Sequence, residues 1–288
     1  MKHCALLTMD DLSDFECYDH LINPPLNKLG WQVEDVSWKN KQVNWNNYDA
    51  VIVRSPWDYQ EHLDEFILLL KNIEGSTALL VNSLELQLWN INKKYLKTLE
   101  DKGCKIVPTL WQNSYSEDSL VQAFDYFSCD ELIIKPCVSA GASDTFRLSN
   151  KQPIEHNKLT QIFNHRDFMM QPFIKQILDP GEYSIFYFNG QYSHAILKTP
   201  KENDFRVQEE YGGQLAIIDP SQALLQHSQE VLQQLPDQSL YARLDFVKVE
   251  DDYLLMEAEL IEPSLYFNMD DQSASRFAKA FNHYYEEN

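Results

Sequence analysis

The stretch Tyr241–Ile261 constrains the chain most, because it has the pattern of a β-hairpin with charge on one face. Two aromatic-rich segments of alternating polarity flank a short acidic turn. Successive side chains of a strand point to opposite faces, so Arg243 and Asp245 share one face of the first strand. By the same rule Glu257 and Glu259 share one face of the second. The pattern therefore predicts three carboxylates and one guanidinium on one side of a hairpin.

Three neighbouring carboxylates are unfavourable without a partner. Two carboxylates about 4 Å apart repel by about 4 kcal/mol at an effective dielectric constant of about 20. Protonation of one carboxylate relieves the repulsion, and so does a hard divalent cation such as Mg²⁺, which a few carboxylates hold together with substrate phosphates. The alternative is a solvated acidic face on an edge hairpin. Features upstream favour the cation.

The composition limits the fold and the partners. The chain has 288 residues, of which 44% are hydrophobic, so we expect two or three subdomains with sizeable cores. A net charge of −20 argues against nucleic acid and anionic membranes as main partners. The five cysteines form no CxxC pair or Cys/His cluster, so neither a zinc site nor a disulfide framework is indicated. With no signal-peptide pattern and no apolar run of about 18 residues, we expect a cytoplasmic protein without a membrane span.

The first 90 residues alternate strand and helix patterns, which predicts a small α/β domain. Arg54 and Asp58 lie where the apolar strand Tyr48–Ser55 opens into a loop. Ligands bind at this carboxyl edge in open α/β sheets, and a guanidinium suits a substrate carboxylate. We therefore expect Arg54 and Asp58 to contact the substrate. The alternative is a turn fixed by Pro56, in which Arg54 pairs with Asp58.

The middle of the chain has two features that suit phosphate. The apolar strand Glu131–Pro136 ends in Lys135, and a lysine that closes a buried strand needs a partner for its ammonium. The loop Ser139–Thr145 follows at once and is rich in small and hydroxyl side chains, which can surround phosphate oxygens. It is not a Walker A loop, and a plain β-turn is the alternative.

Further elements follow from periodicity and from capping residues. We expect a strand over Cys104–Leu110, and we expect the charged loop Thr199–Gly213 to act as a lid over a site. The helices predicted outside the first domain are Asn92–Lys102, Glu117–Phe127, Ser221–Leu235 and Ser273–Tyr285.

The order of these parts resembles the ATP-grasp superfamily, which includes glutathione synthetase and D-alanine–D-alanine ligase. Lys93, Ile134-Lys135-Pro136, the small-residue loop, Gln171, Arg243-x-Asp245 and Glu257-x-Glu259 carry the resemblance. It covers nearly the whole chain and implies an α/β and α+β fold. An N-terminal α/β (pre-ATP-grasp) domain at residues 1–90 would precede a two-lobed ATP-grasp fold, with lobes at 91–174 and 175–288.

The resemblance also implies site residues. Those expected at the nucleotide are Lys93, Lys135, Ser139, Gly141, Ser143, Gln171, Phe173, Ile174 and Glu182. Those expected at Mg²⁺ are Asp245, Glu257 and Glu259, with Mn²⁺ as an alternative because the family often has Asn in place of Glu259. Those expected to act on the reacting groups are Arg243, Lys198 and Arg206. An exposed helix lysine is the alternative reading of Lys93.

The segments RSPWDY, GEYSIFYFNG, SHAILK and DFRVQEEYGG are similar to one branch of small ATP-grasp proteins, which includes the cyclo-ligase of D-cycloserine synthesis. The resemblance implies an ATP-dependent carboxylate–amine ligase. It would act through an acyl phosphate on a small amino-acid-like or peptide substrate and would release ADP and phosphate. A phosphotransferase on the same scaffold and a non-catalytic nucleotide-binding protein are the alternatives. A homodimer is expected from the base rate of oligomers.

Overall fold

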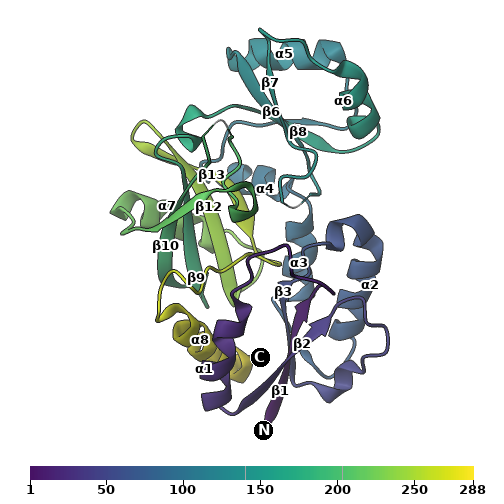
Figure 1. The fold of residues 1–288 in the computed structure, drawn as a ribbon, viewed down its shortest axis with the longest axis vertical. Helices are drawn as coiled ribbons and strands as arrows, with labels where there is room; N and C mark the ends of the chain where they lie inside the picture. The colour runs from purple at the N-terminus through teal and green to yellow at the C-terminus, as the bar shows by residue number, and fades with distance from the viewer. Residues whose placement is uncertain (140, 203) are drawn as a thin grey trace.

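The computed structural model describes residues 1–139, 141–202 and 204–288, and it contains three β-sheets (Figure 1). The N-terminal sheet has the order β2-β1-β3-β4 and is parallel throughout. Its strands are β1 (Lys2–Thr8), β2 (Trp31–Ser37), β3 (Ala50–Ser55) and β4 (Leu79–Val81). The helices of this region are α1 (Asn23–Lys28), α2 (Leu63–Glu74) and α3 (Leu84–Ile91).

Both faces of the N-terminal sheet are covered by helices, which explains why every residue of β3 is buried. Ala5 and Leu7 of β1 pack in the same hydrophobic cluster as Phe66 of α2. Cys4 and Leu6 point to the other face, which the C-terminal helix α8 (Ser273–Glu287) covers with Phe277, Phe281 and their neighbours. The end of the chain therefore completes the first core, and α8 lies beside α1 (Figure 1).

The second sheet is antiparallel, in the order β5-β8-β6-β7. It forms the lobe at the top of Figure 1, where two helices cover one face. Its elements are β5 (Leu110–Gln112), α5 (Glu117–Phe127), β6 (Glu131–Pro136), β7 (Phe146–Ser149), α6 (His156–Phe163) and β8 (Phe168–Pro172). Helix α4 (Tyr95–Asp101) lies between this lobe and the rest of the molecule.

The third sheet is also antiparallel and has the order β11-β10-β9-β12-β13. Its elements are β9 (Glu182–Phe188), β10 (Gln191–Thr199), β11 (Gln214–Ile217), α7 (Gln222–Gln233), β12 (Tyr241–Val249) and β13 (Asp252–Glu259). The short 3₁₀ helices of the chain are η1 (Asp19–Ile22), η2 (Trp45–Asn47), η3 (Tyr59–His62), η4 (Lys175–Ile177) and η5 (Glu209–Tyr211). Strand β12 lies between β9 and β13, so the predicted hairpin joins the sheet through β12, and β13 forms one edge of the sheet.

The predicted fold class is confirmed, because the structure has an α/β domain followed by two lobes with antiparallel sheets. The strand expected over Cys104–Leu110 is wrong, because Ile106 makes only an isolated bridge with Leu255 and the regular strand begins at Leu110. The helix expected from Asn92 begins at Tyr95, and helices α3 and α6 and strands β7 and β11 were not predicted. The boundaries 1–90, 91–174 and 175–288 stay a prediction. Within the described residues no helix has the length and hydropathy needed to cross a membrane.

Candidate active site

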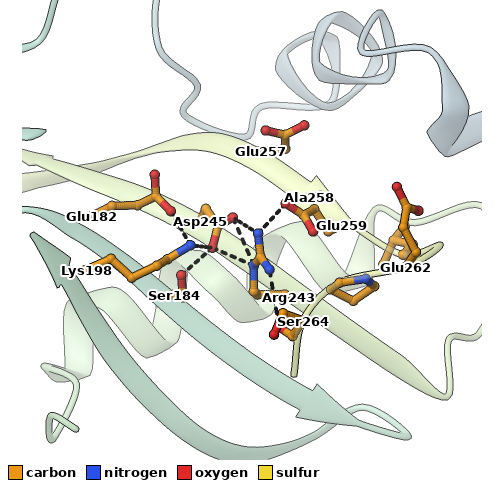
Figure 2. A network of polar contacts seen from close by, with 12 residues as sticks. Glu182, Ser184, Lys198, Arg243, Asp245, Glu257, Ala258, Glu259, Glu262 and Ser264 are labelled. Atoms are coloured by element: carbon orange, nitrogen blue, oxygen red, sulfur yellow. Dashed lines mark hydrogen bonds and ion pairs between the residues drawn. The ribbon is translucent and has the colours of Figure 1, made fainter. Parts of the chain in front are cut away.

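One cavity of about 350 Å³ lies between the second and third sheets, and the N-terminal domain closes one end of it. Most of the predicted site residues line it. They are Lys93, Lys135, Ser139, Gly141, Gln171, Phe173, Ile174, Glu182, Lys198, Arg206, Arg243, Asp245, Glu257 and Glu259. Strands β6, β9, β10, β12 and β13 therefore bring together side chains from distant parts of the sequence. Figure 2 shows those that come from the third sheet.

The hairpin carries its charges on one face, as the alternation predicts. Arg243 pairs in register with Glu259, and Asp245 pairs with Glu257. Asp245 is buried and accepts hydrogen bonds from Arg243 Nε at 3.1 Å and Arg243 Nη2 at 3.0 Å (Figure 2). Ser184 Oγ donates to it at 2.5 Å. Burial raises the pKa of Asp245, but the charges of Arg243 and Lys198 outweigh burial and the pKa is lowered, so this carboxylate is ionised.

The other two carboxylates also have cationic partners. Arg243 Nη2 donates a hydrogen bond to Glu259. Burial nevertheless raises the pKa of Glu259 to about 7. Lys93 Nζ lies 2.8 Å from Glu257 Oε1 and donates to the Ser139 carbonyl at 2.6 Å. Burial lowers the pKa of Lys93, but the Glu257 carboxylate outweighs burial and raises it. The structure therefore relieves the crowding of acids with lysine and arginine side chains.

A divalent cation fits the donor set. In the described part of the chain no three His, Cys, Asp or Glu side chains converge into a closed metal site. Mg²⁺ is nevertheless suited here, because it takes one or two carboxylates and completes its shell with phosphate oxygens and water. Asp245, Glu257 and Glu259 offer only oxygen donors and line one cavity. The side chains of Glu257 and Glu259 are 28% and 30% exposed, so both keep oxygen surface open to the cavity.

Lys135 differs from the other cations of the cavity. Lys93, Lys198, Arg206 and Arg243 are each ion-paired, whereas Lys135 has no ion pair with any residue that the structure describes. Burial lowers the pKa of Lys135, although the charge of Glu257 partly offsets this. An ammonium that lacks a carboxylate partner at the wall of a cavity is suited to bind an anionic ligand.

Two further predicted residues form an ion pair across β9 and β10. Lys198 Nζ lies 2.5 Å from Glu182 Oε1 and 3.6 Å from Asp245 Oδ1, and it is 3% exposed (Figure 2). Burial raises the pKa of Glu182 even though Lys198 opposes the shift. Lys198 thus links the acid expected at the ribose to the acid expected at the metal.

The loop predicted to act as a lid, residues 199–213, lines the cavity with Arg206 and its neighbours. Arg206 Nη2 lies 2.8 Å from Asp204 Oδ2, and the guanidinium stacks at 3.7 Å on the ring of Tyr211. The Tyr211 hydroxyl donates to the Gly141 carbonyl at 3.5 Å, so this loop touches the small-residue loop of the opposite lobe. Ser143 is exposed and does not line the cavity, so its predicted nucleotide contact has no support here.

The predicted substrate contacts of Arg54 and Asp58 need correction, because neither residue lines the cavity. Arg54 is fully buried, and its Nε and Nη2 donate to Asp19 Oδ1 at 3.2 and 3.1 Å. Asp58 accepts from Trp38 Nε1 at 2.6 Å and pairs with Lys39. The alternative pairing of Arg54 with Asp58 is not formed either. The strand end does hold a polar network, but it faces the packed interior.

Sequence reasoning missed many of the residues that line the cavity, among them two aromatic residues of the N-terminal domain and two residues beyond the hairpin. Trp57 and Tyr59 follow β3, and Glu262 and Tyr266 follow β13. Glu262 could have been suspected because acidic residues continue beyond the hairpin. A strand pattern does not, however, predict the direction of side chains in an irregular segment. Figure 2 shows Glu262 beside the ion-pair network, with no contact drawn to it.

Comparison with known families decides the fold family. A model described as the prokaryotic glutathione synthetase ATP-grasp domain matches residues 92–272, more than half of the chain. The chain belongs to the ATP-grasp family. The expectation of an ATP-dependent, ADP-forming C–N ligase is thereby confirmed at the level of the family. Members bind ATP with Mg²⁺, and the carboxylates and lysines predicted for such a site line one cavity of this ATP-grasp chain.

The N-terminal region of this ATP-grasp chain has its own match, because a model described as the D-cycloserine synthetase DcsG N-terminal domain covers residues 4–82. The cycloserine biosynthesis protein DcsG of Streptomyces lavendulae is 26% identical over 279 residues, which cover 89% of this chain and 91% of that protein. The crystal structure of D-cycloserine synthetase DcsG superposes with a TM-score of 0.86 at 24% identity, over 98% of this chain and 99% of the other.

More distant ATP-grasp structures share the fold alone. The ligase PsnB complexed with a minimal precursor gives a TM-score of 0.69 at 15% identity, over 98% of this chain and 99% of that one. D-alanine–D-alanine ligase from Bacillus anthracis gives 0.70 at 10% identity, over 100% and 98%. The three sheets found here are therefore the common architecture of these ATP-grasp proteins.

Proposed function

We propose that this protein activates the carboxylate of a small amino-acid-like or peptide substrate as an acyl phosphate and joins it to an amine, with release of ADP and phosphate. One observation carries the proposal. Lys135, which has no ion pair with any described residue, lines the same cavity as the three hairpin carboxylates, from the opposite lobe. A magnesium nucleotide needs this combination, because its phosphates require cations and its metal requires oxygen donors.

In the first step a carboxylate oxygen of the substrate attacks the γ-phosphorus of ATP, and the bond to the ADP oxygen breaks. Lys135 and Lys93 would bind the phosphates, with Ser139 and Gly141 of the small-residue loop beside them. Asp245, Glu257 and Glu259 would hold Mg²⁺, which when bound supplies positive charge to the phosphate oxygens, and Mn²⁺ is a second candidate. Gln171, Phe173, Ile174 and Glu182 would hold the nucleoside.

In the second step an amine attacks the acyl carbon, the bond to phosphate breaks, and the amine loses a proton. Arg243 lines the cavity and would stabilise charge on the acyl phosphate. Arg206 enters from the lid loop and would neutralise the departing phosphate. Because water hydrolyses an acyl phosphate, the contact of Tyr211 with Gly141 supports closure of the cavity by this loop.

Product analysis tests the proposal. Purified protein is incubated with ATP, Mg²⁺ and candidate substrates, and nucleotides, phosphate and amide are quantified. We expect one ADP and one orthophosphate per amide. Formation of AMP and pyrophosphate would contradict the mechanism, and a phosphorus NMR signal from a stable phosphorylated product would identify a phosphotransferase instead. Nucleotide binding without turnover would point to a non-catalytic protein.

Small D-amino-acid derivatives are the first substrates to try, because one relative is named for D-cycloserine synthesis and another for D-alanine ligation. Ring closure within one molecule and joining of two molecules are both compatible with the chemistry above. We also propose a cytoplasmic location, where ATP is available, and a homodimer. Cell fractionation and mass measurement in solution test these two points.

A further inference from the structure

The segment Leu260–Tyr266, here named the bridging segment, has an unusual set of backbone contacts. It follows β13, lies outside the three sheets and joins the hairpin to the C-terminal part of the chain. Each of its first six carbonyls accepts a hydrogen bond from a side chain. The donors are Asn82 at 2.8 Å, Tyr241 at 2.9 Å, Trp57 at 2.9 Å, Arg54 at 2.7 Å, Arg243 at 3.2 Å and His194 at 3.1 Å, in chain order of the carbonyls.

Three of these donors come from the N-terminal domain and three from the third sheet. Buried backbone outside a sheet must find other hydrogen-bond partners, and six side chains supply them here. The side chains of the segment divide between the protein interior and the cavity. Leu260 and Leu265 are buried in hydrophobic clusters, whereas Glu262, Ser264 and Tyr266 line the cavity. The bridging segment is thus held rigidly, and it presents one carboxylate to the cavity.

Glu262 differs from the four acids of the ion-pair network in the cavity. Asp245, Glu182, Glu257 and Glu259 each have an ion pair, whereas Glu262 has none with any described residue. Burial raises the pKa of Glu262 to about 8, and the negative charge of Glu259 adds to this shift. The positive charge of Lys93 and a hydrogen bond from the Tyr59 hydroxyl lower the pKa, but they offset the shift only in part. Lys93 is itself bound to Glu257. A cationic ligand would compensate this carboxylate.

The surroundings of Glu262 suit an ammonium group. Trp57 Nε1 donates to the Glu262 carbonyl, and Trp57 and Tyr59 line the same cavity. Aromatic faces attract ammonium ions, and a carboxylate accepts charge-assisted hydrogen bonds from them. We propose that Glu262 binds a primary ammonium group of the substrate, so that the protein selects small molecules with a free amino group. This inference rests on the proposed ligase function, because it places the substrate in the same cavity as the nucleotide.

A paired panel tests the inference. The protein is screened with D- and L-amino acids and with the N-acetyl derivative of each. Thermal shift in the presence of ADP and Mg²⁺ measures binding, and ADP release in the presence of ATP and Mg²⁺ measures turnover. We expect the compounds that bind to have a free amino group and their N-acetyl counterparts to be inactive. Binding or turnover by the N-acetyl compounds, or a panel in which no amino compound binds, would overturn the proposal.

Glu262→Gln then tests the residue. We expect the KM for the amino compound to rise about tenfold or more, because a hydrogen bond between charged groups is lost, while the KM for ATP changes less than twofold. Glu262→Asp should recover part of the affinity. Glu210→Gln is the matched control, since it removes one negative charge from an exposed position of the cavity wall. An unchanged KM for the amino compound in Glu262→Gln would overturn the assignment.

The two proposals fail differently. Glu262-dependent binding of amino compounds without ADP release would support the ammonium site and contradict the ligase. Formation of ADP and amide that does not depend on Glu262 would support the ligase and contradict the ammonium site. Loss of binding together with a lowered melting temperature, not recovered by Glu262→Asp, would indicate a structural role and would also contradict the site.

Discussion

Arg54 Nη2 donates a hydrogen bond of 2.7 Å to the carbonyl oxygen of Pro263, a residue 209 positions later in the chain. The guanidinium also binds Asp19, and its central carbon lies 5.0 Å from the centre of the Tyr241 ring. One buried cation thereby joins the end of β3, the segment before α1 and the bridging segment. The domain that is expected to bind substrate and the lobe that carries the proposed metal ligands are connected through this contact.

Arg54→Lys tests this connection. A lysine has no planar fork and cannot satisfy both Asp19 and the Pro263 carbonyl in the same geometry. We expect the free energy of unfolding to fall by about 3 kcal/mol, because a buried carboxylate and a buried carbonyl lose their partner. Urea unfolding measures the loss. Unchanged stability with a raised KM for a carboxylate substrate would restore a direct substrate contact of Arg54.

Lys135→Met gives the opposite stability prediction. Lys135 has no ion pair with any described residue, and burial lowers its pKa, so we expect the melting temperature to stay the same or to rise. The KM for ATP should rise about tenfold or more, because phosphates lose a charged partner. Lys93→Met is the matched variant. It leaves Glu257 unpaired and should therefore lower the melting temperature as well. Destabilisation by Lys135→Met with normal ATP kinetics would contradict the assigned role.

Asp245→Asn separates metal binding from nucleotide binding. Calorimetry with ATP is performed in excess Mg²⁺ and again in EDTA. We expect the gain in affinity that Mg²⁺ provides to fall about tenfold or more, while the affinity in EDTA is unchanged or tighter because one repulsive charge has gone. Asp251→Asn, in the exposed turn of the same hairpin, is the control and should behave as wild type. Equal dependence on Mg²⁺ in Asp245→Asn would place the metal elsewhere.

The elements that follow from local patterns were predictable. Helix α5 begins after Ser116, whose hydroxyl accepts from the Ser119 amide, and its predicted span Glu117–Phe127 is the observed one. Arg243, Asp245, Glu257 and Glu259 share a face because strand alternation fixes which way each side chain points. Lys135 stood out because it closes a buried strand.

What failed depends on contacts between distant segments. Arg54 lies at the sheet edge where ligands bind in many α/β proteins. Its guanidinium instead binds Asp19 and the Pro263 carbonyl, and no local pattern connects these partners to Arg54. Glu262 was missed for the same reason, since six side chains from two domains fix the backbone that carries it. The strand expected over Cys104–Leu110 failed because the apolar run there forms only an isolated bridge, between Ile106 and Leu255.

The pH dependence of stability provides a further check through His194. This ring stacks on Phe186 with 4.2 Å between centroids, its Nε2 donates to the Leu265 carbonyl, and its Nδ1 accepts from Ser193 Oγ. Burial lowers the pKa of His194 to about 4, with Asp270 opposing the shift and Arg276 adding to it. The folded protein therefore favours the neutral form of the His194 ring. This preference contributes stability that is fully present above pH 6.5 and is lost as the pH falls toward 4.

We expect this loss to reach about 3 kcal/mol between pH 6.5 and pH 4. Urea unfolding at several pH values measures the slope, and His194→Gln should flatten it over that range. His283, an exposed histidine of α8, gives the control His283→Gln, which should leave the slope unchanged. A slope that is the same in His194→Gln and wild type would contradict the assignment.

A crystal structure with a non-hydrolysable ATP analogue and Mg²⁺ tests most directly whether the two lobes hold a magnesium nucleotide between them. The account predicts phosphate oxygens within hydrogen-bonding distance of Lys135 Nζ, and metal density bonded to oxygens of Asp245, Glu257 or Glu259. A nucleotide bound outside this cavity, or a metal that none of the three carboxylates contacts, would contradict it.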